Sequence, residues 1–172
     1  MTRIGLISDT HITAEQEAFW PPIAAALAGV DLILHAGDIY ATCVLDWLEQ
    51  IAPVVAAKGN GDVGRSAAKD RRVQAAHLLE VAGRRIGLVH IFLPEQYFPF
   101  DQYLARCFGG PVDVVVCGDT HYAEIVDHQG VLIVNPGSPT FPNNYQKQLG
   151  TVGLLEIRNG QCEAKIIRLA PG

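Results

Sequence analysis

Seven side chains of the types that bind divalent metal ions fall at the ends of short apolar runs. They are Asp9, His11, Asp38, Asn60, His90, Asp119 and His121. In open α/β sheets, ligands bind beyond the carboxyl ends of the strands. Five strand ends would each deliver one or two of these side chains to a single edge. Singly, each motif is typical of a turn or a packed residue, but together and in this order they predict a metal site.

The donor types indicate which metals and which chemistry to expect. Neutral imidazoles combined with carboxylate and amide oxygens suit Mn²⁺, Fe²⁺, Zn²⁺ or Ni²⁺ rather than an ion that prefers thiolates. Two cations about 3.5–4 Å apart are the arrangement of two-metal hydrolases. A water that bridges two such cations would lose a proton near neutral pH and become a nucleophile. No protein nucleophile is then required.

The apolar pattern predicts the elements that position these side chains. Strands are expected over 3–8, 31–35 and 53–57, with helices within 14–28 (a late start after Pro21-Pro22) and around 42–51. This alternation favours a parallel sheet covered by helices. The later chain predicts a hairpin of 77–81 and 85–90, a helix near 99–108, a strand over 112–117 and hairpins turning near Gln129-Gly130 and Asn159-Gly160. We expect one α/β domain, residues 1–172, with two packed sheets.

Composition narrows the class of protein. Of the 172 residues, 49% are hydrophobic and 18% are charged, which predicts a folded domain with a large core. The formal net charge of −5 offers no basic surface for a long nucleic acid. No apolar run is long enough for a membrane span, and the N-terminus lacks a signal-peptide layout, so we expect a cytoplasmic protein. The cysteines are expected to be ordinary buried thiols: Cys43, Cys107, Cys117 and Cys162.

The chain resembles the calcineurin-like metallophosphoesterase superfamily in short motifs that span most of its length. The motifs are Asp9-Thr10-His11, Gly37-Asp38, Gly59-Asn60-Gly61-Asp62, His90, Gly118-Asp119-Thr120-His121 and Asn135-Pro136-Gly137-Ser138. The chain is most similar to the small bacterial and archaeal phosphodiesterase branch, which also contains the eukaryotic retromer scaffold subunit. The resemblance implies a four-layer α/β/β/α sandwich of two packed mixed sheets flanked by helices.

The resemblance also implies how two divalent ions are held, Mn²⁺ being favoured and Fe²⁺, Zn²⁺, Ni²⁺ or Mg²⁺ also accommodated. One ion would bind Asp9, His11, Asp38 and His121. The other would bind Asp38, Asn60, His90 and Asp119, so that Asp38 is shared. Catalytic roles are implied for Asp9, Asp38, Asn60 and His90.

Three departures from the family pattern bear on activity. Asp119 stands where the family usually has histidine, which makes the second site richer in oxygen and predicts more tolerance of Mn²⁺ or Mg²⁺. Gly61 stands where many members have a histidine that protonates the leaving group. Asp62 is a nearby candidate acid, although a capping or turn role is the stronger expectation. His90 is followed by the hydrophobic stretch 91–100 rather than by glycine.

Several further residues have more than one interpretation. The stretch 91–100 is expected to cover the sheet edge as a hydrophobic plug; the alternatives are a wall of the substrate site that uses Tyr97 and Phe98, or a dimer contact. His35 is expected to be a packed strand-end histidine rather than a partner of the metal ligands. His77 and His128 are expected at the surface or in turns. Arg65, Asn143 and Asn144 could reach a phosphate, although polar loop residues of this kind usually face water. The Asn135–Ser138 segment is expected to shape a loop near the metals.

The function that follows is metal-dependent hydrolysis of a small phosphodiester or phosphomonoester by a metal-bridging hydroxide. The principal alternative is a catalytically weak or inactive protein-interaction module of the same fold. The seven retained ligand types favour the enzyme. A nuclease would require a basic groove, which the acidic composition disfavours. No membrane partner is expected, and a homodimer is allowed.

Overall fold

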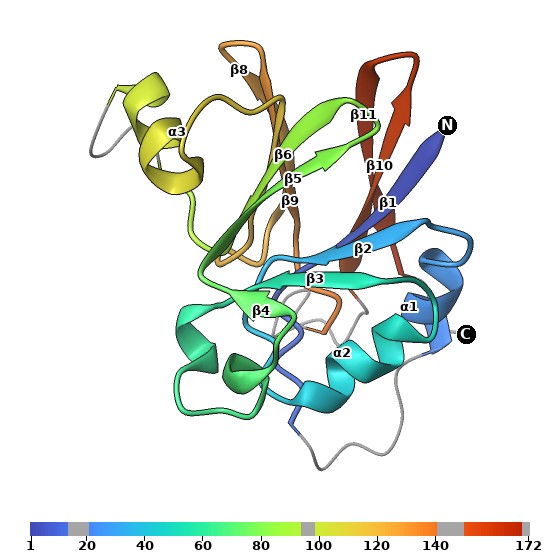
Figure 1. The fold of residues 1–172 in the computed structure, drawn as a ribbon. Helices are drawn as coiled ribbons and strands as arrows, with labels where there is room; N and C mark the ends of the chain where they lie inside the picture. The colour runs from blue at the N-terminus through green and yellow to red at the C-terminus, as the bar shows by residue number, and fades with distance from the viewer. Residues whose placement is uncertain (14–20, 94–98, 141–149, 170–172) are drawn as a thin grey trace.

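Two β-sheets form the centre of the protein (Figure 1). The computed structural model describes residues 1–13, 21–93, 99–140 and 150–169. The first sheet has the order β11-β10-β1-β2-β3-β4. Its strands are β1 (Thr2–Ile7), β2 (Leu32–His35), β3 (Val54–Ala57), β4 (Val73–Gln74), β10 (Thr151–Arg158) and β11 (Gln161–Arg168). β1 to β4 run parallel, whereas β10 is antiparallel to β1 and β11 is antiparallel to β10.

The second sheet has the order β5-β6-β7-β9-β8. Its strands are β5 (Ala76–Val81), β6 (Arg84–Val89), β7 (Val114–Val116), β8 (Ala123–His128) and β9 (Val131–Pro136). β6, β7 and β9 are parallel, and β5 and β8 are antiparallel edge strands. Both sheets are therefore mixed. Each has a parallel centre whose strand ends can place loops at one edge.

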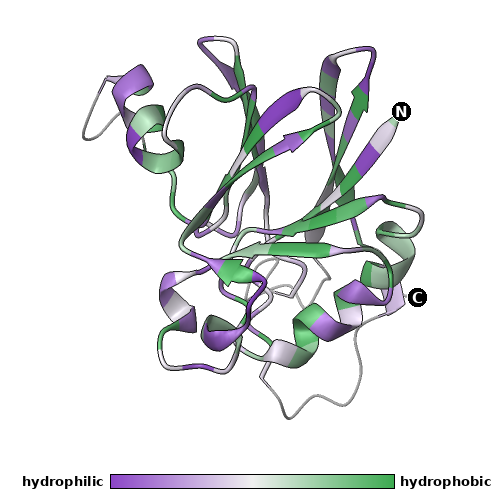
Figure 2. Ribbon diagram, in the orientation of Figure 1, coloured by the Kyte–Doolittle hydropathy of each residue, from purple (hydrophilic) through white to green (hydrophobic). Residues whose placement is uncertain are grey.

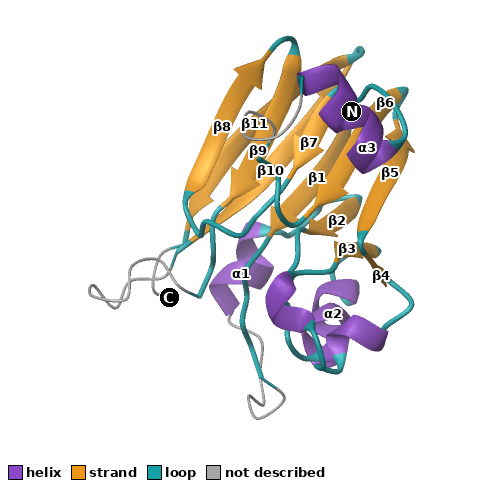
Figure 3. Cartoon of the chain, turned by 90° about the vertical axis from the view of Figure 1, so that its left-hand side faces the viewer, coloured by secondary structure: helices purple, strands orange, loops and turns teal. Residues whose placement is uncertain are grey.

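Three α-helices cover the outer faces of the sheets (Figure 3). Helices α1 (Pro21–Ala26) and α2 (Thr42–Glu49) pack on the first sheet through a cluster that includes Ile23, Val44 and Leu48. Helix α3 (Phe100–Phe108) covers the second sheet through Leu104 and Phe108. A third cluster, with Ile4, Leu34 and Leu88, lies between the sheets. These layers confirm the predicted α/β/β/α sandwich.

The parallel strands β1, β2 and β3 of the first sheet are hydrophobic on both faces because both faces are covered. In β1, Ile4 and Leu6 belong to the cluster between the sheets, whereas Ile7 belongs to the cluster under the helices. Figure 2 shows that β2 and β3 are hydrophobic along most of their length. A central parallel strand buried on both sides has this composition. The apolar runs that predicted these strands are therefore the strands that carry the polar loops.

The predicted hairpins are present, and each turns where the sequence indicates. Ala82-Gly83, Gln129-Gly130 and Asn159-Gly160 all have positive φ at both residues. Two successive residues of this kind form the tight turn whose twist matches antiparallel strands. Strand β4 and the 3-10 helices η1 (Asn60–Asp62) and η2 (Ala67–Lys69) have no counterpart in the prediction. They are too short to produce a recognisable hydrophobic period.

Two described residues of the hydrophobic stretch after His90, Phe92 and Phe100, pack against the second sheet. Phe92 contacts the rings of Phe100, Tyr103 and Phe108, and so joins the cluster under α3. For Phe92 and Phe100 this confirms the predicted plug. Tyr97 and Phe98 lie outside the described residues, as do Asn143 and Asn144.

The cysteines correct one expectation. All four are free thiols, but only Cys117 is fully buried, while Cys43, Cys107 and Cys162 are partly exposed. The prediction of four buried thiols was therefore wrong for three of them, because these lie on helix and edge-strand surfaces that the layers only partly cover. Burial raises the pKa of the Cys117 thiol to about 12, which leaves it protonated and unreactive at neutral pH. Among the described helices, none has the length and apolar character needed to cross a membrane.

Candidate metal centre

Loops from both sheets meet at one edge and bring the seven predicted ligands together. Each loop follows a strand: β1 precedes Asp9 and His11, β2 precedes Asp38, β3 precedes Asn60, β6 precedes His90, and β7 precedes Asp119 and His121. Backbone hydrogen bonds join loops of the same sheet, since the Asp9 amide donates to Gly37 and the His11 amide donates to Asp38. Across the sheets, the Asp119 amide donates to Asp9 Oδ2 at 3.1 Å.

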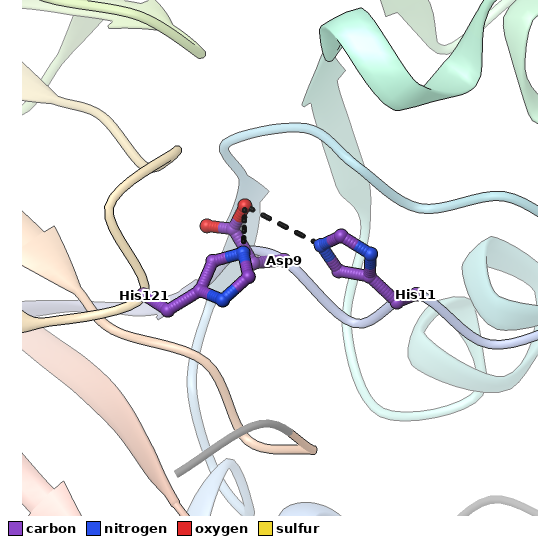
Figure 4. A group of neighbouring side chains, drawn as sticks. All are labelled: Asp9, His11 and His121. Atoms are coloured by element: carbon purple, nitrogen blue, oxygen red, sulfur yellow. Dashed lines mark ion pairs between the residues drawn. The ribbon is translucent and has the colours of Figure 1, made fainter. Parts of the chain in front are cut away.

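One group of side chains is centred on Asp9 (Figure 4). A single carboxylate oxygen, Asp9 Oδ1, lies 3.8 Å from His11 Nε2 and 3.5 Å from His121 Nε2. Asp9 is fully buried, and this oxygen has no hydrogen-bond partner among the described residues. A buried carboxylate oxygen without a donor is costly unless a cation lies against it. This geometry fits a divalent ion among the three side chains.

A second group joins Asp38 and His90, and its ligand atoms also lie close to Asp9. Asp38 Oδ2 is 3.5 Å from His11 Nε2, whereas Asp38 Oδ1 is 3.5 Å from His90 Nε2. His90 Nε2 also lies 2.9 Å from Asn60 Oδ1 and 3.7 Å from Asp119 Oδ1. The two oxygens of Asp38 thus face two different sets of side chains. A carboxylate in this position can bridge two cations.

The backbone at the centre is held in an unusual conformation. Five of the seven predicted ligands have positive φ: Asp9 at 54°, His11 at 49°, Asp38 at 55°, Asp119 at 72° and His121 at 62°. The other non-glycine residues with positive φ in the described chain are Tyr40 and the three hairpin residues Ala82, Gln129 and Asn159. The left-handed region costs a residue with a side chain of order 1 kcal/mol or more. Such conformations persist where the surrounding structure imposes them, and they concentrate at functional sites.

Hydrogen bonds outside the centre orient the imidazoles. His90 Nδ1 lies 2.7 Å from the carbonyl oxygen of Ala36. A carbonyl only accepts, so Nδ1 carries the proton, and in the neutral ring Nε2 presents its lone pair to the centre. His11 Nδ1 is bonded to the Tyr40 hydroxyl at 2.7 Å, again leaving Nε2 toward the two carboxylates. Sequence reasoning missed Tyr40, because a tyrosine two residues after Gly-Asp carries no motif of its own.

The carboxylate of Asp62 organises two of the ligand loops. It is fully buried and accepts four backbone N–H groups, from Asp38 (3.1 Å), Ile39 (2.8 Å), Tyr40 (2.9 Å) and Gly59 (2.8 Å). With both oxygens occupied in this way, Asp62 is not placed to protonate a leaving group. The capping role is confirmed.

His35 and the Asn135–Ser138 segment hydrogen-bond to the loops that carry the predicted ligands. His35 is fully buried, accepts the Gly37 amide at Nδ1 and therefore donates from Nε2 to Thr10 Oγ1. This confirms the predicted packed histidine. Asn135 Nδ2 donates to the Gly118 carbonyl, and Ser138 Oγ donates to the Asp9 carbonyl. The segment thus shapes the ligand loops, as expected.

Two other histidines lie away from the centre. His77 was expected at the surface, but it is half-buried on β5 and its Nε2 bonds to the Ala56 carbonyl at 2.8 Å. The expectation was wrong because it took no account of the packing of β5 against β3. His128 ends β8 at its hairpin turn, as predicted, with its ring against Phe100.

The electrostatics of the centre also suit cations. Burial works to raise the pKa of Asp9, but the side chains of His11 and Ser8, together with the charges of His90 and His121, outweigh it and hold the pKa below its usual range. Asp9 is therefore ionised at neutral pH, with buried Asp38 and the partly exposed Asp119 close by. Three carboxylates, three imidazoles and one amide around this edge form an oxygen- and nitrogen-donor set suited to first-row divalent metals.

Comparison with known proteins identifies the family. The model of the calcineurin-like phosphoesterase superfamily domain matches residues 2–160. The chain belongs to this superfamily. A similar protein, a probable metallophosphoesterase of Methanothermobacter thermautotrophicus, is 35% identical over 167 residues, which cover 96% of this chain and 91% of the relative. Members of this superfamily use divalent metals, and the centre offers the side chains to bind them.

Solved structures of the same fold cover nearly the whole chain. An archaeal phosphodiesterase aligns with a TM-score of 0.70 at 23% identity, covering 96% of this chain and 100% of that one. Vps29 of Entamoeba histolytica in complex with Zn²⁺ aligns with a TM-score of 0.68 at 20% identity, covering 97% and 99%. At these identities the likeness establishes the shared fold. The activity must be argued from the site itself.

Replacement of Asp62 by asparagine is expected to destabilise the protein by about 2 to 4 kcal/mol, because an amide NH₂ would face backbone N–H donors that the carboxylate now satisfies. Chemical denaturation measures the loss. Asp127→Asn is the matched control, since Asp127 is exposed and accepts the amide of Gly130 alone among the described backbone amides. Equal stability of the two variants would contradict the role of Asp62 in holding the two ligand loops together.

The buried His35 predicts a loss of stability in mild acid. Desolvation lowers its pKa from 6.5 to about 4, so between these values the unfolded chain takes up a proton that the folded chain does not. Above about pH 6.5, neutral His35 makes its full contribution to the free energy of unfolding. As the pH drops toward 4, this group lowers that free energy by at most about 1.4 kcal/mol per pH unit. Denaturation of metal-free protein at several pH values should show a shallower slope for His35→Gln. An unchanged slope would contradict this origin.

Proposed function

We propose that this protein is a dinuclear metal-dependent phosphodiesterase that hydrolyses a small phosphodiester. The observation that carries the proposal is Asp38, whose two oxygens face two separate groups of potential ligands. The proposed ligands of one ion are Asp9, His11, Asp38 and His121, and those of the other are Asp38, Asn60, His90 and Asp119. Mn²⁺ is the favoured ion at both positions, with Fe²⁺, Zn²⁺, Ni²⁺ or Mg²⁺ as alternatives.

Two ions held by these residues would supply Lewis acidity toward the phosphoryl oxygens and would activate a water as the nucleophile. The protein prepares the site by holding His90 and His11 with their Nε2 atoms inward, through Ala36 and Tyr40. Asp62 holds the loops of Asp38 and Asn60 in register. No described serine, threonine or cysteine is needed as a nucleophile in this scheme.

The alternative to an enzyme is a catalytically weak interaction module of the same fold, a fold that Vps29 also has. The retained ligand types and the buried, unpaired oxygen of Asp9 favour the enzyme, since a surface used only for docking needs neither. A single domain, a homodimer and a cytoplasmic location remain predictions from the sequence.

The purified protein, freed of metal and reconstituted with Mn²⁺, Ni²⁺, Mg²⁺ or Zn²⁺, should hydrolyse bis-p-nitrophenyl phosphate, and chelation should abolish turnover. Asp38→Asn should lower kcat/KM by at least about 100-fold, because the bridging charge is lost. Asp127→Asn should retain full activity. A protein that binds none of these metals and turns over neither this diester nor p-nitrophenyl phosphate would be the interaction module instead.

Asp119 predicts the metal preference of the second position. Its Oδ1 lies 3.7 Å from His90 Nε2, where an anionic oxygen favours harder ions than an imidazole does. We expect Asp119→His to shift activation from Mn²⁺ or Mg²⁺ toward Zn²⁺, measured as the ratio of kcat/KM with each metal and as metal affinity by calorimetry. Asp127→His, the same exchange on an exposed hairpin, is the control. A preference that matches the wild type would remove this role for Asp119.

A further inference from the structure

The structure leaves no room for an acidic side chain at position 61. The Gly61 amide donates to Asp38 Oδ1 at 2.7 Å, so the backbone lies directly against the proposed bridging carboxylate. A Cβ atom at Gly61 would lie 2.8 Å from Cε1 of Tyr40 and 2.9 Å from Asp38 Oδ2. Contacts this short force a neighbour to move. Tyr40 and Asp38 thus occupy the space that a side chain at 61 would need, so any residue that assists the leaving group comes from another position.

Arg65 is fixed at this same place by two contacts. Its Nε donates to the Gly61 carbonyl at 2.8 Å, and its guanidinium carbon lies 3.6 Å from the centre of the Tyr40 ring. The Tyr40 hydroxyl in turn bonds Nδ1 of His11, a proposed metal ligand. The Tyr40 side chain therefore contacts both the guanidinium of Arg65 and His11. Stacking on an aromatic face and a hydrogen bond at Nε together restrict a side chain that is otherwise flexible.

Among the described residues, none forms an ion pair with Arg65. In the described parts of the chain, no carboxylate lies within ion-pair distance of it, and its terminal Nη groups donate to no described residue. Arg72 differs, since it pairs with Asp46, Glu49 and Asp70. Arg84 also differs, since it pairs with Asp113. Arg65 is exposed, and its guanidinium is held beside the loop that carries Asn60 and Gly61. A guanidinium held in this way, with Nη groups that meet no described residue, is suited to bind an anionic oxygen.

We propose that Arg65 is a catalytic residue that hydrogen-bonds the leaving-group oxygen of the phosphoester through its Nη groups. The inference rests on the proposed phosphodiesterase function. As the attacking water oxygen forms its bond to phosphorus, the bond to the leaving oxygen breaks and its electron pair departs on that oxygen. The proton lost by the water passes to solvent. Arg65 keeps its own protons, stabilises the developing anion, and the anion is later protonated from solvent.

This role predicts a dependence on the leaving group. A nitrophenolate is stable as an anion and gains little from Arg65, whereas a phenolate or alkoxide gains much more. Arg65→Ala should lower kcat/KM by about 10- to 100-fold for phenyl and alkyl diesters, but by less than about threefold for bis-p-nitrophenyl phosphate. A plot of log kcat/KM against leaving-group pKa should therefore become steeper in the variant. Arg65→Lys should recover part of the loss, since it keeps the charge but not the planar stacking.

The matched control is Arg71→Ala, which removes the same charge from an exposed residue that contacts neither Gly61 nor Tyr40 in any described interaction. It should keep the wild-type slope. A second readout without turnover is calorimetric binding of orthovanadate to the metal-loaded protein, because its apical oxygen takes the leaving-group position. Arg65→Ala, and not Arg71→Ala, should weaken this binding about tenfold or more.

The outcomes separate the two proposals. Wild-type protein with neither turnover nor vanadate binding would reject the phosphodiesterase. An active wild type, with Arg65→Ala either unaffected or impaired equally for all leaving groups, would reject the role of Arg65 and leave the phosphodiesterase standing. A steeper slope together with weaker vanadate binding, confined to Arg65, would establish it.

Discussion

The centre of this protein depends on one buried carboxylate that binds no metal in our assignment. Asp62 accepts backbone N–H groups from the loop after β2 and from the start of the loop after β3, and so joins two segments that are 20 residues apart in the sequence. The same four hydrogen bonds stabilise the negative charge of Asp62 in a site from which water is excluded. Because Asp38 and Asn60 lie within these segments, their side chains are positioned by Asp62 before any ion binds.

The clustering of carboxylates at this centre is unfavourable in the absence of cations. Carboxylates brought together away from water repel each other, and each costs several kcal/mol to bury. The structure adds to this by holding Asp9, Asp38 and Asp119 in left-handed backbone conformations. The layered core on both sides of each sheet supplies the stability that offsets these costs, as strained sites generally require. Divalent cations bound at the proposed site would favour the same cluster of charge that destabilises the metal-free protein.

One departure from the family pattern, Gly61, belongs to a connected set of contacts around Tyr40. The Tyr40 ring fills the space beside Gly61, and the Tyr40 hydroxyl bonds and orients His11. The guanidinium of Arg65 stacks on the face of the same ring. The absence of a side chain at 61 is therefore part of a repacked corner of the site. Asp119 lies beyond His90, on the other side of Asp38, and changes the second set of ligands independently. A fold shared with proteins as different as an archaeal phosphodiesterase and Vps29 leaves such differences to individual side chains.

The sequence by itself determined the layered α/β architecture, the hairpins and the seven converging ligand types. These are encoded locally, in apolar runs, in turn residues such as Asn159-Gly160, and in polar residues placed directly after strands. Only the tertiary structure decided that Asp62 is a clamp, that His77 is partly buried, that Tyr40 bonds His11, and that Arg65 rests on Tyr40 and Gly61. The physical reason is the same in each case. These roles arise from contacts between loops and strands distant in sequence, and a side chain's hydrogen-bond partners are set by how the two sheets and their loops pack.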